Sequence, residues 1–139
     1  MMMDPAPAAD LAAVAQQCLD ATHDGSLSFP AIIGRLIEAG FEGYAVDYRR
    51  SAQSFYLPDG TSLDLPMPSH AGPVAAAFDK AVVEAQIRWA QSGDQAYTYQ
   101  AFSRNVAAAG CAGYLVSFLG RRVVYYGRTG DIHVELFPQ

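Results

Sequence analysis

The stretch Ala39-Gly40-Phe41-Glu42-Gly43-Tyr44-Ala45-Val46 decides the fold, because a second copy of it occurs later in the chain. The second copy is Ala109-Gly110-Cys111-Ala112-Gly113-Tyr114-Leu115-Val116, at an offset of 70 in the numbering (109 − 39), and five of the eight positions are identical. Each copy is typical of a helix end, a glycine stop and the start of a strand. The sequence therefore predicts one structural unit that occurs twice.

The offset of 70 extends without a gap from Leu11/Ala81 to Pro66/Leu136. We interpret residues 10–66 and 80–136 as two repeats of a helix–helix–three-strand unit within a single domain. Residues 1–9 form a lead, and residues 67–79 form the linker and the start of the next helix. Identical pairs outside the duplicated block include Ala15/Ala85, Gln16/Gln86, Ala31/Ala101, Tyr56/Tyr126 and Gly60/Gly130.

Apolar residues at spacings of three and four predict two helices in each repeat. The first begins at Asp10 as N-cap, and its counterpart includes Val74 and Phe78. Ser28 and Thr98, which are related by the same offset, are expected to cap the second helices. Alternating patterns predict strands at 44–49, 53–57, 61–65, 114–119, 123–126 and 132–137.

These elements predict an α+β fold. Two helices per repeat cannot cover two separate three-stranded sheets at this chain length. We therefore expect one antiparallel sheet, shared or abutting across a pseudo-twofold axis, with the helices packed on one face.

The last strand of each repeat differs in its apolar pattern. Leu63 and Leu65 have the inward parity in the first repeat, whereas Ile132, Val134 and Leu136 have it in the second. Because side chains alternate with a period of two, one of these strands is expected to slip or bulge relative to the other. The same pattern places His133 on a solvated face.

Composition excludes several classes of protein. The chain has 139 residues, 51% of them apolar, with 14 acidic and 9 basic residues and a net charge of −5. This balance argues against nucleic-acid binding, which needs a dense basic stripe, and against a membrane surface. The N-terminus lacks the pattern of a signal peptide, and the longest apolar run is too short to cross a bilayer, so we expect a cytoplasmic protein. Cys18 and Cys111 are expected to be small buried hydrophobic residues.

No catalytic, metal or cofactor motif is recognisable. The three histidines, His23, His70 and His133, are scattered, and no phosphate-binding or dinucleotide fingerprint occurs. We therefore predict no catalytic residue, no metal and no cofactor, and favour a non-enzymatic role. The alternative is a small enzyme with an asymmetric acid/base site, using Asp47 or His70 near Tyr48.

Two groups of side chains are candidates for ligand binding. Aromatic residues recur on the predicted strands, where they form either core or an apolar pocket with polar tips. Two arginine pairs, Arg49-Arg50 and Arg121-Arg122, fall in equivalent hairpins and suit an anionic ligand or an acidic partner, or serve only to keep an edge soluble. The aromatic candidates are Tyr44, Tyr48, Tyr56, Tyr114, Phe118 and Tyr126, beside Phe55 and Tyr125 on the same strands.

The pairing of the two halves resembles the YbcV-like family of bacterial proteins, some of which carry the label phage envelope protein. The second half carries the resemblance through residues 99–102, 107–110 and 113–116, then Tyr125-Tyr126 and residues 134–138. The first half matches through Phe29-Pro30, Ala39-Gly40 and Gly43-Tyr44. The resemblance implies no catalytic residue.

Together these observations favour a binding module for a small molecule or a protein partner, and a homodimer is one form that such a partner could take. A phage-related structural or interaction protein is the third class, and it would show a flat apolar patch.

Overall fold

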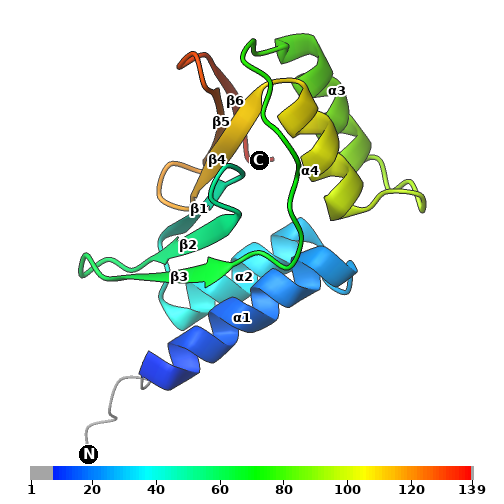
Figure 1. Cartoon of the computed structure of the whole chain (residues 1–139). Coiled ribbons are helices and arrows are strands. Elements are labelled where there is room, and N and C mark those ends of the chain that lie inside the picture. Colours follow the sequence, from blue (N-terminus) through cyan, green and yellow to red (C-terminus); the bar gives the residue numbers. More distant parts are fainter. Residues whose placement is uncertain (1–7, 139) are drawn as a thin grey trace, which may run out of the picture.

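The computed structural model describes residues 8–138 (Figure 1). Within this range the order of elements is helix–helix–three strands, followed by the same order again, which confirms the α+β fold class. The first repeat contains α1 (Ala8–Asp24), α2 (Phe29–Ala39), β1 (Gly43–Asp47), β2 (Ala52–Tyr56) and β3 (Ser62–Pro66). The second repeat contains α3 (Lys80–Gln91), α4 (Tyr99–Ala108), β4 (Cys111–Ser117), β5 (Arg122–Gly127) and β6 (Ile132–Leu136).

The six strands form one antiparallel sheet in the order β3-β2-β1-β4-β5-β6. At its centre Ala45 of β1 pairs with Leu115 of β4, and these positions are themselves 70 apart (115 − 45). The pseudo-twofold axis therefore passes between them. In Figure 1 both helix pairs lie on one side of the sheet, α1 and α2 beside the first half and α3 and α4 beside the second.

The second helix of each repeat begins and ends as the sequence predicts. The Ser28 hydroxyl accepts a hydrogen bond from the backbone N–H of Ala31 at 3.3 Å, and Thr98 accepts the equivalent bond from Ala101 at 3.1 Å. Each bond satisfies a backbone donor that the first helical turn leaves free. Gly40 then ends α2 in the left-handed conformation, with a φ of 103°.

The starts of the first helices differ from the prediction. Helix α1 begins at Ala8, so Asp10 lies inside its first turn instead of capping it. Helix α3 begins after Asp79, whose carboxylate accepts a hydrogen bond from the N–H of Val82 at 3.2 Å. The preceding residues are held on α4, because the N–H of Ala75 donates to the carbonyl of Ala107. Val74 and Phe78 therefore belong to the linker.

The offset of 70 is also wrong for the first helices. The buried residues of α3 are Val83 and Ile87, which match the buried Ala15 and Leu19 of α1 at an offset of 68. At an offset of 70, Ala15 would correspond to the exposed Ala85. The connection between α3 and α4 (92–98) is longer than that between α1 and α2 (25–28), so packing sets the phase of each first helix independently.

Strand β6 does not slip relative to β3. Tyr56 pairs with Ser62 in the first repeat, and the equivalent Tyr126 pairs with Ile132 in the second, so the two registers are identical. The prediction of a slipped or bulged third strand is wrong, and the register shift in the second repeat lies instead in β4, between Cys111 and Gly113. The two repeats differ instead in the side chains that β3 and β6 carry at equivalent positions.

The helix-facing positions that Leu63 and Leu65 occupy in β3 are occupied in β6 by His133 and Glu135. Both β6 residues are well shielded from solvent, whereas their strand neighbours Ile132, Val134 and Leu136 are exposed. Strand β6 therefore directs its polar residues toward the helices and its apolar residues away from them.

Candidate functional site

Four side chains of α3 and β6 form a polar network under the helix. His133, only 9% exposed, lies with Nε2 2.7 Å from Glu135 Oε1 and Nδ1 3.4 Å from Glu84 Oε1. Arg88 donates two hydrogen bonds to Glu135, at 2.9 and 3.2 Å. The expected solvated position of His133 is thus wrong, because Glu135 on the same strand and Glu84 on α3 lie against its two ring nitrogens inside the molecule.

The Glu135 carboxylate is fully occupied by hydrogen bonds, so the network leaves no obvious general acid or base. Burial alone raises the pKa of Glu135, but hydrogen bonds from Arg88 and His133 outweigh burial and hold the pKa below its usual value. Both carboxylate oxygens accept hydrogen bonds from Arg88, and one of them also lies against His133. The arrangement suits a structural ion network that fixes α3 on β6.

The predicted aromatic candidates divide between core and surface. Tyr44, Tyr48 and Tyr114 are buried beneath the helices, where the Tyr99 and Tyr114 hydroxyls lie 2.7 Å apart. Ser103 Oγ donates to the Tyr48 hydroxyl at 3.3 Å. Burial raises the pKa of these tyrosines, so the phenols stay protonated at neutral pH and cannot act as bases. This part of the aromatic set is packed core.

The remaining aromatic candidates lie nearer the surface. Phe118 is half-buried, with its ring centroid 6.2 Å from that of Tyr44. Tyr56 and Tyr126 lie on the other face of the sheet, away from the helices, where Tyr56 is exposed and Tyr126 half-buried. Gly113 makes room for Tyr126, because a Cβ at Gly113 would lie 2.5 Å from the phenol oxygen.

The buried pair of hydroxyls gives a stability prediction. Tyr99→Phe is expected to lower the free energy of unfolding by about 1–2 kcal/mol, because it leaves the Tyr114 hydroxyl without its partner in the core. The double change Tyr99→Phe/Tyr114→Phe should cost less than the sum of the two single changes. Urea denaturation measures these values, with the exposed Tyr56→Phe as control; a neutral Tyr99→Phe contradicts the pairing.

The two arginine pairs lie at opposite ends of the sheet. Asp47, the last residue of β1, pairs with Gly113 near the start of β4, so the hairpins that follow β1 and β4 point in opposite directions. Arg121 is already engaged, since its guanidinium carbon lies 5.7 Å from the centroid of the Phe137 ring. The four arginines therefore do not converge on one ligand.

The residues of the alternative acid/base site have separate surroundings. Asp47 Oδ1 accepts hydrogen bonds from the backbone N–H groups of Arg49 and Arg50, at 3.0 and 3.2 Å, and so caps the turn after β1. His70 is exposed in the linker, whereas Tyr48 is buried. These positions share no enclosed site.

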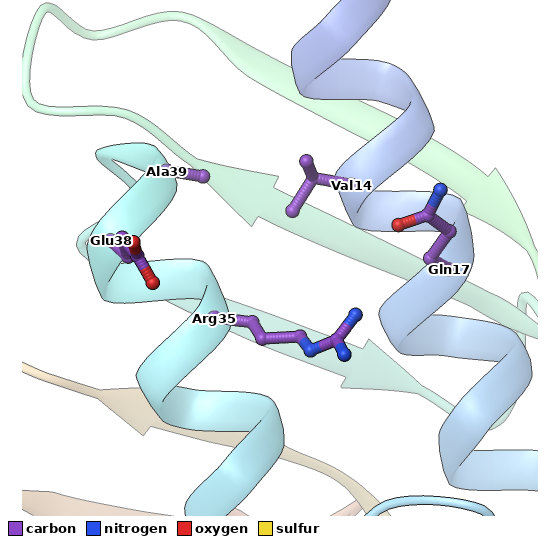
Figure 2. A pocket seen from close by; sticks show the side chains of 5 residues that line it. All are labelled: Val14, Gln17, Arg35, Glu38 and Ala39. Carbon is purple, nitrogen blue, oxygen red and sulfur yellow. The ribbon is translucent and has the colours of Figure 1, made fainter.

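Two surface grooves lie beside the helix pairs, and both are open to solvent. The first, about 460 Å³, lies between α1 and α2, and Figure 2 shows the Arg35 side chain extending across it toward Gln17. The second, about 380 Å³, is lined by residues of the linker, α3 and α4. A small-molecule site normally encloses its ligand and adds converging polar groups, and neither groove has this form. The first groove is lined by Val14, Gln17, Arg35, Glu38 and Ala39.

The most distinctive surface is the side of β4, β5 and β6 that no other element of residues 8–138 covers, here named the open face. Its centre is a cross-strand row of Leu115, Val124 and Val134, and Tyr126 pairs with Ile132 in the next row. The relative exposures are 41% for Leu115, 56% for Ile132, 38% for Val134 and 63% for Leu136. The open face consists of Leu115, Val124, Tyr126, Ile132, Val134 and Leu136.

The equivalent surface of the first repeat is polar. The row that continues from Leu115 across the sheet contains Ala45, Ser54 and Asp64. Ser54 Oγ donates a hydrogen bond to Asp64 Oδ1 at 2.6 Å. The central row of this side of the sheet is thus polar over the first repeat and apolar over the second, although Tyr56 of the first repeat is also exposed on this side.

Of the ten binding candidates from sequence, Tyr126 belongs to the open face and Arg122 borders it, opposite Leu136. The sequence interpretation missed the other five residues of the open face. It placed Ile132, Val134 and Leu136 toward the helices, since it took apolar residues to mark the core. The matching turn residues Gly60 and Gly130, with φ of 92° and 82°, were the signal that the two hairpins share one register.

Comparison with known proteins gives a family. Among the helices of residues 8–138, none has the length and apolar character needed to cross a membrane. The same residues contain no group of three or more histidine, cysteine or acidic side chains that could hold a metal ion. A search of curated proteins found no significant match. The family model described as "Protein of unknown function (DUF1398)" matches residues 16–135, and the chain belongs to that family.

Proposed function

We propose that the protein is a non-enzymatic binding module that recognises a protein partner through the open face. The observation that carries this proposal is the reversed polarity of β6. Strands β3 and β6 have the same register in equivalent positions, yet only β6 turns its apolar side chains away from the helices.

The reversal has a free-energy cost in the isolated chain. Drawing His133 and Glu135 out of water costs desolvation free energy that their hydrogen bonds offset in part. Ile132, Val134 and Leu136 meanwhile gain little from burial, because they remain exposed. A partner that covers the open face removes this apolar surface from water and so accounts for the pattern.

The size of the open face fits a binding surface. Its exposed fractions correspond to roughly 400–500 Å² of apolar surface, which is the size of the largest and often functional patches on monomeric proteins. The charge pattern of β6 favours docking onto the face of the sheet rather than onto its edge. Strand β6 is an edge strand, and inward-pointing charged residues such as Glu135 are a means by which proteins discourage edge-to-edge pairing.

Two further parts of the proposal have separate support. A cytoplasmic location is supported by Cys18 and Cys111, which are both free thiols. Burial raises the pKa of the Cys111 thiol to about 11, which fits a packing role rather than a reactive one.

The resemblance to proteins labelled phage envelope protein supports a structural role as the second candidate, since a flat apolar patch also suits assembly.

Site-specific photo-crosslinking tests the proposal. A benzoylphenylalanine placed at Val134 is expected to form crosslinks in cells that produce the full chain. The same group at Ser54 is the control, because Ser54 lies in the same cross-strand row on the polar half of the sheet. Adding Leu136→Asp should remove the crosslinks from position 134. No crosslinks from 134, or equal yields from 134 and 54, would overturn the proposal.

A further inference from the structure

We infer that the partner on the open face is a second copy of this chain, in a twofold dimer that packs the two sheets face to face. This inference rests on the proposed function and names the partner.

The open face is complementary to itself. In a twofold dimer the same patch meets itself, so any charge at its centre meets a like charge. The chain has a net charge of −5, and carboxylates are therefore the usual obstacle to self-association. The central row Leu115–Val124–Val134 contains no charged side chain, whereas its continuation in the first repeat ends at Asp64. The uncharged half of the sheet is thus the half that can face its own copy.

The area fits a stable dimer. Two copies of the open face contribute about 900 Å² of apolar surface, which is close to the apolar share of a standard interface of about 1,600 Å². Exposed rim residues such as Arg122 supply the polar remainder. Two sheets packed in this way lie about 10 Å apart, as in a β-sandwich.

The position of Arg122 selects the orientation of the two copies. Along β5, Arg122, Val124 and Tyr126 point to the same side, with Arg122 at one end and Tyr126 at the other. If the two β5 strands run parallel, each Arg122 faces the other Arg122 and the charges repel. If they run antiparallel about Val124, each Arg122 faces Tyr126 of the second copy, and a guanidinium packs favourably on an aromatic ring. The dimer is therefore antiparallel.

Analytical ultracentrifugation of the purified full chain tests the dimer. The wild-type chain is expected to sediment as a dimer at micromolar concentrations, and Val134→Asp should raise the dissociation constant by about 100-fold or more. Ser62→Asp is the matched control, because it adds the same charge on the same side of the sheet but outside the open face, at the β3 position equivalent to Ile132. It should change the dissociation constant by less than about threefold.

Circular dichroism and thermal unfolding establish that each variant is folded. If Val134→Asp does not fold, Leu136→Asp takes its place, since Leu136 is the most exposed residue of the open face. A wild-type chain that stays monomeric up to about 200 µM overturns the dimer. So does a folded open-face variant that dimerises as the wild type does. A monomer that still forms crosslinks from position 134 to another protein contradicts the dimer alone, whereas a monomer without such crosslinks contradicts the proposed function as well.

Discussion

Gly110→Ala is expected to lower the free energy of unfolding by about 4 kcal/mol or more, whereas Gly40→Ala costs about 1–2 kcal/mol. The two glycines are equivalent in the two repeats, and both are left-handed, with φ of 94° and 103°. A Cβ at Gly40 meets nothing within 4 Å, but a Cβ at Gly110 lies 2.0 Å from the carbonyl oxygen of Ala77. The added cost at Gly110 is therefore the cost of displacing the linker.

Chemical denaturation of the two variants measures this difference. The linker is fixed at both sides of the contact, because the N–H of Ala75 donates to Ala107 and the N–H of Asp79 donates to Ala109 at 2.7 Å. It cannot move away from Gly110 without losing these bonds. Equal losses in Gly110→Ala and Gly40→Ala would contradict the packing of the linker on the end of α4.

Glu135→Leu is expected to lower the free energy of unfolding by about 2 kcal/mol, because it removes the 2.7 Å contact of a buried histidine. The double change His133→Leu/Glu135→Leu installs the residues that β3 carries at the same positions. It should recover most of the loss, because no polar group is then left buried without a partner. The measurements need low protein concentration, because the double variant removes the inward-pointing charges that discourage edge-to-edge pairing of β6 with another chain.

The contribution of Glu135 should also depend on pH. Its pKa is lowered in the folded protein, so the stabilisation is fully present above the unfolded pKa and is lost as pH falls through the folded pKa. The stability difference between the wild-type chain and Glu135→Leu should therefore shrink as pH is lowered from about 5 to about 3. A difference that stays constant over this range would contradict the charged form of the network.

The sequence was sufficient for the features that depend on local chemistry. Ser28 and Thr98 cap their helices because a side-chain oxygen satisfies a free backbone donor wherever the helix is placed. Gly40 and Gly110 end theirs because left-handed backbone favours glycine in any context. The duplicated block then predicts that both halves have the same order of elements, and the shared sheet follows from the need to cover six strands with four helices.

The sequence was not sufficient for the features that depend on which face is covered. Alternation in β6 separates Ile132, Val134 and Leu136 from His133 and Glu135, but it does not say which set faces the helices. That choice depends on Glu84 and Arg88, which lie far earlier in the chain, on α3, and provide partners for the polar set. The buried side of α3 could not be predicted for the same reason. Packing, rather than the repeat, determines which residues of α3 are buried.

The most direct test of this account is a methyl NOE measurement by NMR on the full chain. The structure pairs Val134 with Val124 on the open face, so NOEs are expected between the methyl groups of these two residues. His133 should in turn show NOEs to Tyr125, because their ring centroids lie 6.3 Å apart on the helix side. NOEs from Val134 to Val83 or Ile87, the buried residues of α3, would show that β6 turns its apolar side chains inward. That result would contradict the open face and both proposals built on it.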